Sequence, residues 1–353
     1  MISPNKVSLR AIAVKAGVTR MAVSLALRGK TGVSASLRRK IQKLAKRMGY
    51  APDPEVAKFL SHIRSHSNQK TKACLALLVY GEKRGVWRRS PTERKYIEGA
   101  EKRAATYGYN VEEFWVNEPG MSVQRLGKVI WSRGIEGVII APWQQCGFAT
   151  APRILDLDLS LFSAVEISET IEAPDLDRSM HDQYTSMLKC LEELSKIGYR
   201  KMGLVLEDSM DQRVNGRWTA AYLYHHEKRG GDRTFHPLIL SRLDQGAFDR
   251  WCRRHEPDVV ISVDRFGFRL IQGSGRRIPI EIGYASLDLD GDAEDALNFS
   301  GIDQNSRQVG ESAVDLLISL IHRGQKGVPA RPVRIEVEGK WRAGPSTFRQ
   351  RTR

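Results

Sequence analysis

The first fifty residues contain three segments in which apolar side chains recur at the spacing of a helix. Residues 8–16 and 19–27 form the first two, and only Gly17 and Val18 lie between them. A glycine permits a tight turn, and small alanines on the first helix allow close helix contact. We expect Thr19 to cap the second helix, because its side-chain oxygen can accept a free N–H of the first turn. The pattern predicts a helix-turn-helix.

The third helical segment follows Ser34, a second predicted cap, and ends at Gly49. Its apolar residues lie on one face. The other face carries basic side chains alone, namely Arg38, Arg39, Lys40, Lys43, Lys46 and Arg47. Such a run is often a solvated face. Because all the charges have one sign, however, they repel one another unless an anionic partner binds.

From residue 73 onward, apolar runs alternate with helical patterns. Residues 74–80 are a continuous apolar run, as expected for a strand that is covered on both faces. Further strands are expected at 110–115, 137–142, 201–206, 258–264 and 280–285, and helices at 92–107, 123–132, 182–197 and 214–229. The βαβ order predicts parallel sheets with right-handed crossovers. Since the pattern restarts near residue 182, we expect two similar lobes with a ligand cleft between them.

The charge of the chain is concentrated at its beginning. Residues 1–72 contain 16 Lys and Arg but only 2 Asp and Glu, whereas the rest of the chain is close to neutral. This distribution indicates a nucleic-acid-binding module. A membrane surface would also attract such charge, but no long apolar stretch accompanies it. The four cysteines lack C-x-x-C spacing and no signal peptide is visible, so we expect reduced thiols, no metal and a cytoplasmic location near the nucleoid.

Several motifs resemble the lactose-repressor (LacI/GalR) family of bacterial regulators. They are A-x-x-A-G-V-T-x-x-x-V-S at 13–24, V-S-x-x-x-R-x-K-I at 33–41 and G-Y-x-P at 49–52. Weaker matches follow in order in the body: LEELSKIGYRKMGLV, PDVVISVD, RRIPIEIGYASLD and FSGIDQNSRQVGESAVDLLISLI. The resemblance implies a body built like periplasmic sugar-binding proteins. Its chain would cross between the lobes three times, so that residues near 296–322 return to the first lobe.

The predicted fold is therefore α/β, with an all-α helix-turn-helix head and a two-lobed, periplasmic-binding-protein-like body with parallel sheets. We assign residues 1–50 to the DNA-binding domain, 51–72 to a hinge helix and linker, and 73–353 to effector binding and dimerisation. The resemblance implies a homodimer on a pseudo-palindromic operator. The tail after Trp341 lacks a heptad pattern, which argues against a tetramer held by a C-terminal coiled coil.

The second helix is expected to read DNA in the major groove. Arg20 and Met21 begin it, where an arginine can pair with guanine and a methionine can touch a thymine methyl group. Ser24, Arg28 and Ser34 are better placed for phosphates, which position the protein without specifying sequence. The full set that we expect at the DNA is Ser8, Thr19, Arg20, Met21, Ser24, Arg28, Ser34 and Leu60.

Leu60 lies in a short predicted helix at residues 55–64. This segment is either a linker helix packed on the body or a hinge helix that pushes an apolar wedge into the minor groove. The resemblance favours the wedge, because Leu60 ends the motif V-A-x-x-L. There is one extra residue before this leucine, and the segment continues as Ser-His-Ile-Arg, so Phe59 could share or take the role.

Residues at predicted strand ends are the candidates for binding an effector. Tyr80, Trp143, Asp264 and Asp288 fall there; aromatic rings stack on sugars and carboxylates accept hydroxyl hydrogens. Asp264 matches an effector-contacting aspartate of the family, although such a residue can also cap the next helix. Trp143 could equally belong to the core.

The stretch 213–218 supplies further candidates, Arg213 and Trp218, with Arg217 between them. All three lie where the family places an effector-contacting arginine, but Trp218 occupies the best-aligned position and here the following Gly-aromatic pair is Ala221-Tyr222. Solvation of either arginine at the surface is the alternative.

The chain shows no catalytic pattern. G-x-S-x-G, H-E-x-x-H and a P-loop are missing, so no enzyme activity and no cofactor are expected. The run Asp288-x-Asp290-x-Asp292 resembles a calcium loop but lacks the following glycine and glutamate, and we interpret it as a solvated loop.

The sequence thus predicts a sequence-specific, DNA-binding transcription regulator, with repression as the expected action. Its operator affinity is expected to be controlled by a small molecule, a sugar or sugar derivative. A sugar-binding protein of a transport system is the main alternative, which the basic head and the missing signal peptide argue against.

We predict that Leu60→Gly leaves the fold intact and reduces DNA bending, because it removes the apolar wedge. Bending measured by gel mobility of permuted fragments checks this. An unchanged bend would transfer the wedge to Phe59 or exclude it.

Overall fold

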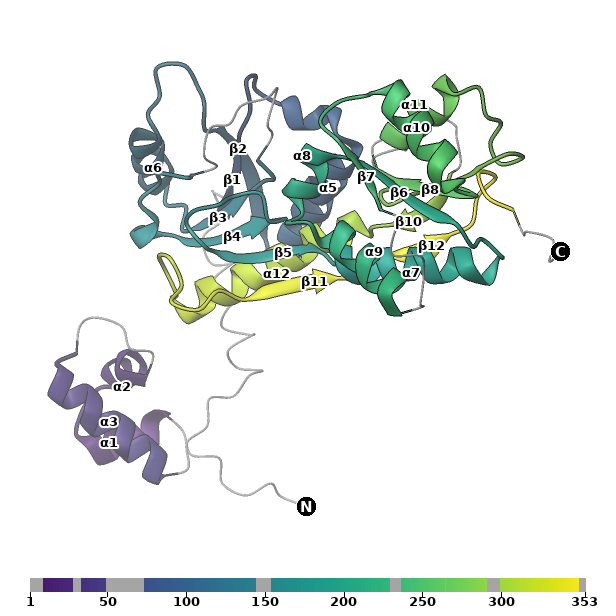
Figure 1. The fold of residues 1–353 in the computed structure, drawn as a ribbon. Helices are drawn as coiled ribbons and strands as arrows, with labels where there is room; N and C mark the ends of the chain where they lie inside the picture. Colours follow the sequence, from purple (N-terminus) through teal and green to yellow (C-terminus); the bar gives the residue numbers. More distant parts are fainter. Residues whose placement is uncertain are drawn as a thin grey trace. The chain divides into compact units, whose positions relative to one another are not determined.

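The computed structural model describes residues 9–27, 33–48, 73–143, 154–228, 236–263, 265–290 and 299–348. The chain divides into two compact units, Met1–Thr71 and Lys72–Arg353 (Figure 1). The predicted hinge at 51–72, including Leu60 and Phe59, lies outside the described residues, as do Ser8, Arg28 and Asp264.

The head consists of three helices, α1 (Leu9–Ala16), α2 (Arg20–Leu27) and α3 (Ala35–Arg47). Ile12, Val23 and Ile41, one from each helix, are fully buried and form the centre of its core. Both predicted caps are confirmed: Thr19 Oγ1 accepts the N–H of Ala22 at 3.1 Å, and Ser34 Oγ accepts that of Leu37 at 3.3 Å. Each cap satisfies a backbone donor that the first turn of a helix leaves free.

The first lobe of the body contains a parallel sheet of order β11-β5-β4-β3-β1-β2. Its apolar strands are covered on both faces, as their continuous hydrophobic runs predict. Helices α5 and α12 pack with Leu75 and Leu77 on one face, and α6 packs with Ala76 and Leu78 on the other. The elements are β1 (Ala73–Val79), α5 (Pro91–Thr106), β2 (Tyr109–Trp115), α6 (Val123–Ser132), β3 (Gly137–Ile140), β4 (Ser163–Ile167), β5 (Asp177–His181), α12 (Ser306–Arg323) and β11 (Arg334–Val337), with 3-10 turns at Val86–Arg89 and Leu159–Leu161.

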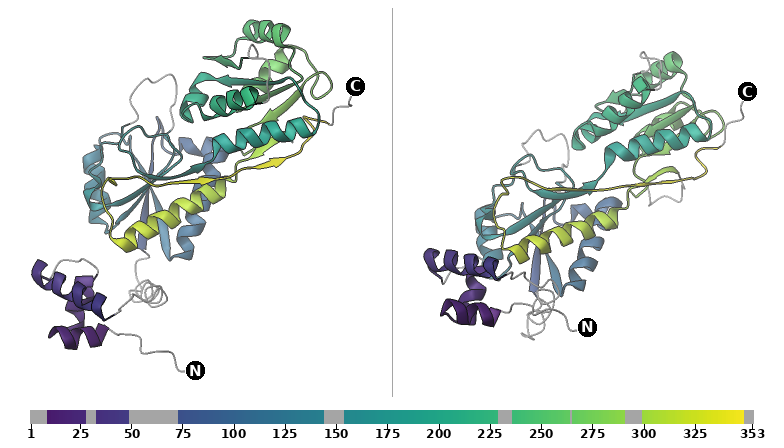
Figure 2. Two further views of the ribbon diagram at one scale, coloured as in Figure 1. Left: turned by 60° about the horizontal axis from the view of Figure 1, so that its bottom comes forward. Right: turned by 90° about the horizontal axis from the view of Figure 1, so that it is seen from below.

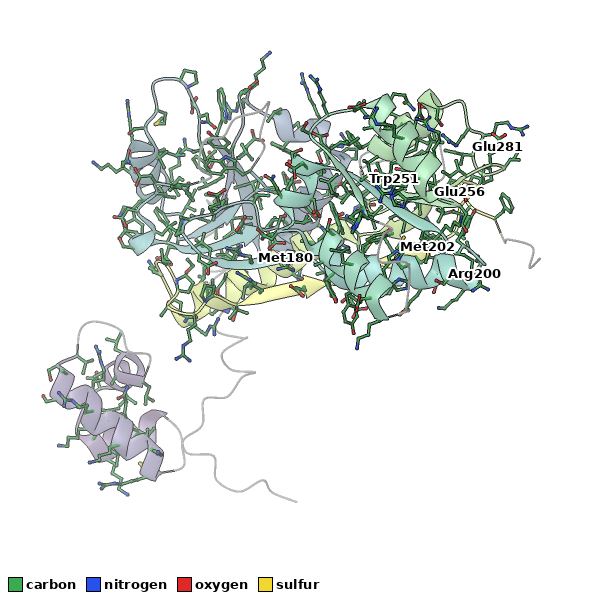
Figure 3. The ribbon with its side chains drawn as sticks, viewed as in Figure 1. Met180, Arg200, Met202, Trp251, Glu256 and Glu281 are labelled. Carbon is green, nitrogen blue, oxygen red and sulfur yellow. The ribbon has the colours of Figure 1, made fainter. Side chains whose placement is uncertain are left out.

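The second lobe repeats this plan with the sheet order β12-β10-β9-β8-β6-β7. Only β12 runs antiparallel to its neighbour among these described strands. Met202 and Trp251 lie in this lobe and are buried, whereas the labelled Arg200, Glu256 and Glu281 are exposed (Figure 3). The elements are α7 (Gln183–Lys196), β6 (Met202–Glu207), α8 (Asp208–Arg213), α9 (Arg217–Lys228), β7 (Leu238–Leu240), α10 (Gln245–His255), β8 (Val259–Ser262), α11 (Phe266–Gly273), β9 (Gly283–Ser286), β10 (Ser300–Asp303) and β12 (Lys340–Arg342).

Three crossovers join the lobes. They run from β5 to α7, from β10 to α12 and from β11 to β12. Helix α12 therefore returns to the first lobe and lies along its sheet, as Figure 2 shows. This confirms the predicted fold class and the predicted return of the chain near residues 296–322.

Two predicted elements need correction. The helix expected at 214–229 begins only at Arg217, as α9, because Asn215 and Gly216 have positive φ angles of 54° and 67°, which a right-handed helix does not adopt. The short helix α8 before this turn was not predicted. The strand expected at 280–285 begins only at Gly283, since the preceding residues form turns.

Glycines allow α5 and α12 to pack backbone against backbone. A Cβ on Gly310 would lie 1.8 Å from the carbonyl oxygen of Tyr96, and one on Gly99 would lie 2.0 Å from that of Arg307. Backbone atoms cannot move aside as a flexible side chain can. The return of α12 to the first lobe therefore depends on these two glycines.

We predict that Gly310→Ala lowers the free energy of unfolding of the body by about 3 kcal/mol, because the added methyl forces the helices apart. Gly246→Ala is the matched control. Its Cβ would meet the flexible side chain of Arg250 at 3.3 Å and that of Asp244 at 3.5 Å but no backbone atom, and alanine is the better helix former. Stability should therefore be unchanged or rise by about 0.5–1 kcal/mol. Denaturant titration measures both. Equal effects would contradict the close contact.

Candidate effector cleft and DNA-binding head

The head presents a basic surface. On α3, the side chains of Arg39, Lys40, Lys43, Lys46 and Arg47 are exposed. Arg20 and Met21 are the first two residues of α2, and Ser24 follows one turn later. Thr19 and Ser34 use their side-chain oxygens as caps. The structure describes the backbone of Arg20, Met21 and Ser24 but not their side chains, so their contacts with DNA stay predictions.

In the body, two of the predicted effector residues lie together. The rings of Tyr80 and Trp143 stack with centroids 3.6 Å apart and an angle of 16° between their planes. They follow β1 and β3, which are neighbours in the sheet, so the parallel register brings both to the same edge. Trp143 is buried in the core of the first lobe, which was the alternative to its effector role, and the partly exposed Tyr80 packs against it.

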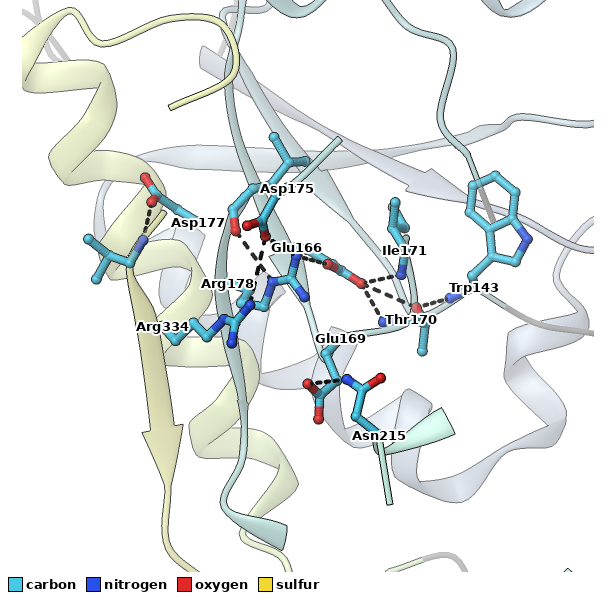
Figure 4. Close-up of polar contacts among 12 residues, drawn as sticks. Trp143, Glu166, Glu169, Thr170, Ile171, Asp175, Asp177, Arg178, Asn215 and Arg334 are labelled. Atoms are coloured by element: carbon cyan, nitrogen blue, oxygen red, sulfur yellow. Dashed lines mark hydrogen bonds and ion pairs between the residues drawn. The ribbon is translucent and has the colours of Figure 1, made fainter. Parts of the chain in front are cut away.

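A buried carboxylate fixes the loop beside this stack (Figure 4). Glu166, on β4, is completely buried, and its Oε1 accepts the N–H groups of Thr170 and Ile171 at 2.6 and 2.8 Å. The Thr170 hydroxyl in turn accepts the N–H of Trp143 at 2.7 Å. Ser168 in the same loop has a φ of 74°, which costs free energy for a residue with a side chain. The bonds to Glu166 offset that cost and hold Trp143 in place.

Arg178, on the neighbouring strand β5, supports the Glu166 carboxylate from its other side. Its guanidinium lies 3.5 Å from Glu166 Oε2 and 2.8 Å from Asp175. Burial raises the pKa of Glu166 to about 7, while Arg178 and the two backbone donors act in the opposite direction. The pair is thus a buried ion pair whose loss on one side would leave a charge without compensation.

The lobes face each other through ionisable side chains. Arg213, at the end of α8 in the second lobe, donates to Glu93 of α5 in the first lobe at 3.1 Å. Glu93 is 1% exposed. Burial raises its pKa to about 7, and Arg213 opposes that rise. The expected solvation of Arg213 at the surface is therefore not its environment here.

Two further contacts cross between the lobes from the same helix. Thr92 donates to Asp288 at 2.7 Å, and Lys95 forms an ion pair with Asp290. Asp290 is 7% exposed and also accepts the N–H of Ser306, so the solvated loop that we predicted is wrong at this residue. The first two turns of α5 thus carry three contacts to the second lobe, from Thr92, Glu93 and Lys95.

A second group of contacts starts from the loop that Glu166 fixes. Glu169 accepts from Asn215 at 2.8 Å and from Arg217 at 3.2 Å, and Arg217 also reaches Glu336 of β11 at 2.8 Å. The turn at 214–216, which precedes α9, therefore directs Asn215 towards the first lobe.

Trp218 lies in a different environment. It is 3% exposed in the core of the second lobe, and its indole N–H donates to Gln183 at 2.9 Å. The structure does not bring it to the Tyr80–Trp143 stack, and its polar atom already has a partner. Its predicted effector contact stays a prediction.

These side chains can bind a hydroxyl-rich ligand. Carboxylates accept hydroxyl hydrogens, guanidinium and amide groups donate, and a stacked aromatic pair offers a flat apolar surface. In the present arrangement each of them is used by the opposite lobe or by a neighbour. Among the described residues, no cluster of His, Cys, Asp and Glu has the arrangement of a metal site. The described helices include none that could cross a membrane.

Comparison with known proteins places the head. Residues 8–53 match the family model "Bacterial regulatory proteins, lacI family". The head is a LacI-family DNA-binding domain. The resemblance that the motifs suggested is confirmed, and the three described helices of the LacI head fall inside the matched range. No curated protein matches the sequence.

The fold of the whole chain also has solved relatives. A transcriptional regulator CelR–cellobiose complex is similar with a TM-score of 0.56 and 18% identity, covering 97% of this chain and 100% of that one. The Lac repressor dimer bound to operator and the anti-inducer ONPF is similar with a TM-score of 0.54 and 15% identity, covering 98% of this chain and 100% of that one. A LacI family transcriptional regulator from Enterococcus faecium with bound ribose is similar with a TM-score of 0.54 and 13% identity, covering 79% of this chain and 100% of that one. At these identities the likeness shows the fold.

Sequence reasoning missed the partners of the predicted residues. Thr92, Glu93, Lys95, Glu169 and Asn215 were not singled out, although they contact the opposite lobe. The one available signal was position: Thr92 and Glu93 begin the helix that follows the first strand. Their partners lie more than a hundred residues away along the chain, and periodicity carries no information about such pairs.

We predict that Arg178→Met lowers the stability of the body by about 3–5 kcal/mol, because it leaves the Glu166 carboxylate buried without its counter-charge. Adding Glu166→Gln should restore more than half of the loss, since the buried charge is then removed too. Denaturant unfolding of the two variants measures the coupling.

Arg334→Met provides the control, because Arg334 is half exposed and lies 3.9 Å from the same Asp175. Its effect should stay within about 0.5 kcal/mol. Additive losses in the double variant would show that Arg178 acts on something other than Glu166.

Proposed function

We propose that the protein is a homodimeric, sequence-specific transcription regulator, acting as a repressor, whose operator affinity is set by a sugar bound between the two lobes of the body. The match of the LacI family model to the three-helix head carries the DNA-binding half of this proposal. The concentration of positive charge in residues 1–72 supports it, because duplex DNA is the matching polyanion.

The effector half rests on the side chains between the lobes. Cellobiose and ribose are bound by two of the solved relatives, and operator DNA by a third. In this chain, Tyr80 and Trp143 offer an aromatic surface, and Arg213 and Asp288 offer a donor and an acceptor. Asp264 is proposed as a further acceptor from its sequence position.

The mechanism follows from the partners of these groups. A ligand that binds Arg213 or Asp288 competes with Glu93 or Thr92 of the opposite lobe. Binding therefore changes the contacts that hold the lobes together and shifts the equilibrium between two arrangements of the body. Because the coupling of two binding sites is reciprocal, a sugar that weakens DNA binding is itself bound more weakly by the DNA complex.

The domain assignment and the location belong to the same proposal. Residues 1–50 bind DNA, 51–72 form the hinge between the two heads of the dimer, and 73–353 bind the effector and the second protomer. The protein acts in the cytoplasm on the nucleoid and catalyses no reaction. A sugar carrier for a transport system would need the body but not a LacI-type head, and the head favours the regulator.

Selection of genomic DNA tests the proposal. Fragments retained by the purified full-length protein at near-physiological salt are sequenced. A single pseudo-palindromic motif is expected, and its neighbouring genes nominate the effector. Retention of fragments without a shared motif, lost smoothly as salt rises, would show that the head binds DNA only through its charge. It would contradict the proposal of a sequence-specific regulator.

We predict that Arg20→Ala weakens binding to the selected operator by about 1–3 kcal/mol and relaxes one base position, because an arginine at the start of α2 reads a base edge. Lys46→Ala, on the exposed basic face of α3, is the comparison and should weaken all sequences alike. Fluorescence anisotropy against operator and scrambled duplex separates the two. An equal loss on both duplexes for Arg20→Ala would exclude base reading by Arg20.

A further inference from the structure

His181 lies where the three crossovers between the lobes meet. It is the last residue of β5, pairs with Val337 of β11, and is 2% exposed. The backbone carbonyl groups of Gln304, on the second crossover, and of Val337, the residue of β11 just before the third crossover, both face its ring. Each of the other two chain segments that join the lobes therefore passes beside this one side chain.

Gly339 shows how closely the third crossover approaches the ring. A Cβ on Gly339 would lie 2.8 Å from His181 Cε1 and 2.8 Å from Ser186 Oγ. A side chain at this position would thus meet the imidazole. The third crossover can pass His181 because it carries a glycine there.

Buried polar atoms without good hydrogen bonds gather at the crossovers. Within the described part of the chain, the hydroxyls of Ser186 and Ser306 are buried with no hydrogen-bond partner, and both ring nitrogens of His181 are buried without a hydrogen bond of good geometry. Ser186 and Ser306 follow the first and second crossovers. Burying a polar atom without a partner costs free energy, so these atoms favour any arrangement of the lobes that gives them partners or water.

The charges around the ring do not compensate for its burial. Asp182, on the same crossover, and Asp290, from the loop after β9, both favour a positive imidazole. Asp290 is already paired with Lys95, and Glu338 of the third crossover is paired with Lys189 on the exposed side. Burial outweighs both aspartates and lowers the pKa of His181 to about 4, so the ring is neutral near pH 7.

We propose that His181 is a pH-sensitive group in the hinge between the lobes. Its neutral ring fits the closed arrangement, in which the three crossovers lie together as in this structure, and its protonation in acid favours separation of the lobes. Hinge motion around a ligand changes the backbone angles of such connecting segments. When the crossovers move apart, water reaches the ring. The pKa then returns towards the ordinary value of about 6.5.

The direction of the pH effect follows from linkage. The open arrangement binds the proton more tightly than the closed one, so opening is favoured as the pH falls below about 6.5. Above this range His181 contributes nothing to the balance. Between about pH 7.5 and 5 the closed-to-open ratio should fall by roughly tenfold or more through His181 alone.

A second group between the lobes acts in the opposite direction. Burial raises the pKa of Glu93 in the closed arrangement to about 7, so Glu93 takes up a proton more readily there and favours closure as the pH falls. Every protein compared therefore carries Glu93→Gln, which removes this opposing effect, so that the remaining pH dependence reports on His181.

The experiment measures the distance between the lobes in the full-length protein without effector or DNA. Spin labels are placed on Lys128→Cys of α6 and Arg254→Cys of α10, two exposed positions in different lobes, after the four native cysteines have been replaced. Excess unlabelled protein ensures that only labels within one chain are recorded. Double electron–electron resonance at about pH 7.5 and 5 then gives the open and closed populations.

With His181 present, the open population should grow in acid by roughly tenfold relative to the closed one. His181→Val should abolish this change and keep the lobes closed at both pH values. His181→Asn, which keeps a polar side chain that does not titrate, should behave like His181→Val and serves if the valine variant does not fold.

His226→Gln is the matched control. Burial also lowers the pKa of His226, but this residue lies on α9 and packs against Tyr222 inside the second lobe. The lobes of the His226→Gln variant should open in acid to the same extent as those of the protein that has both histidines. The proposal is overturned if the lobes do not open in acid, or if the His181 variants open to the same extent.

Discussion

The body depends on the pairing of a buried carboxylate with a guanidinium from the opposite lobe. Glu93 is almost completely enclosed, and Arg213 is the partner that makes its charge tolerable there. Three crossovers alone would leave the two sheets free to rotate about the hinge. The contacts of Thr92, Glu93 and Lys95 from one helix end, with those of Glu169 on the other side, define one arrangement of the lobes.

The same logic links the aromatic stack to the lobe contacts. Glu166 holds the loop that carries Thr170 and Glu169; Thr170 holds the backbone of Trp143, and Glu169 reaches Asn215 across the lobes. Because one loop contacts both residues, a ligand that displaces Trp143 also disturbs the contact with Asn215, and the reverse. The loop tolerates its strained Ser168 because one oxygen of the buried Glu166 carboxylate accepts two backbone N–H groups of the loop.

Local patterns predicted the elements well and their long-range contacts poorly. The parallel sheets, the caps at Thr19 and Ser34 and the return of α12 follow from periodicity, cap chemistry and family motifs, whereas the order of the strands in each sheet was not predicted. The burial of Asp290 does not follow from such patterns, because it depends on Lys95 from the other lobe. The late start of α9 was also missed, although Asn215-Gly216 is a local turn signal. Short polar strands such as β5, with the sequence DRSMH, carry no hydrophobic alternation and are recognisable only once their neighbours are known.

The central claim is that one chain couples a LacI-type head to a sugar-responsive body. The most direct test is the affinity of the full-length protein for its selected operator, measured across a panel of mono- and disaccharides. The account predicts that at least one sugar changes the operator Kd by about 5–150-fold, and that the operator changes the Kd of that sugar by the same factor. A sugar that binds the body and leaves the operator Kd unchanged would contradict the coupling.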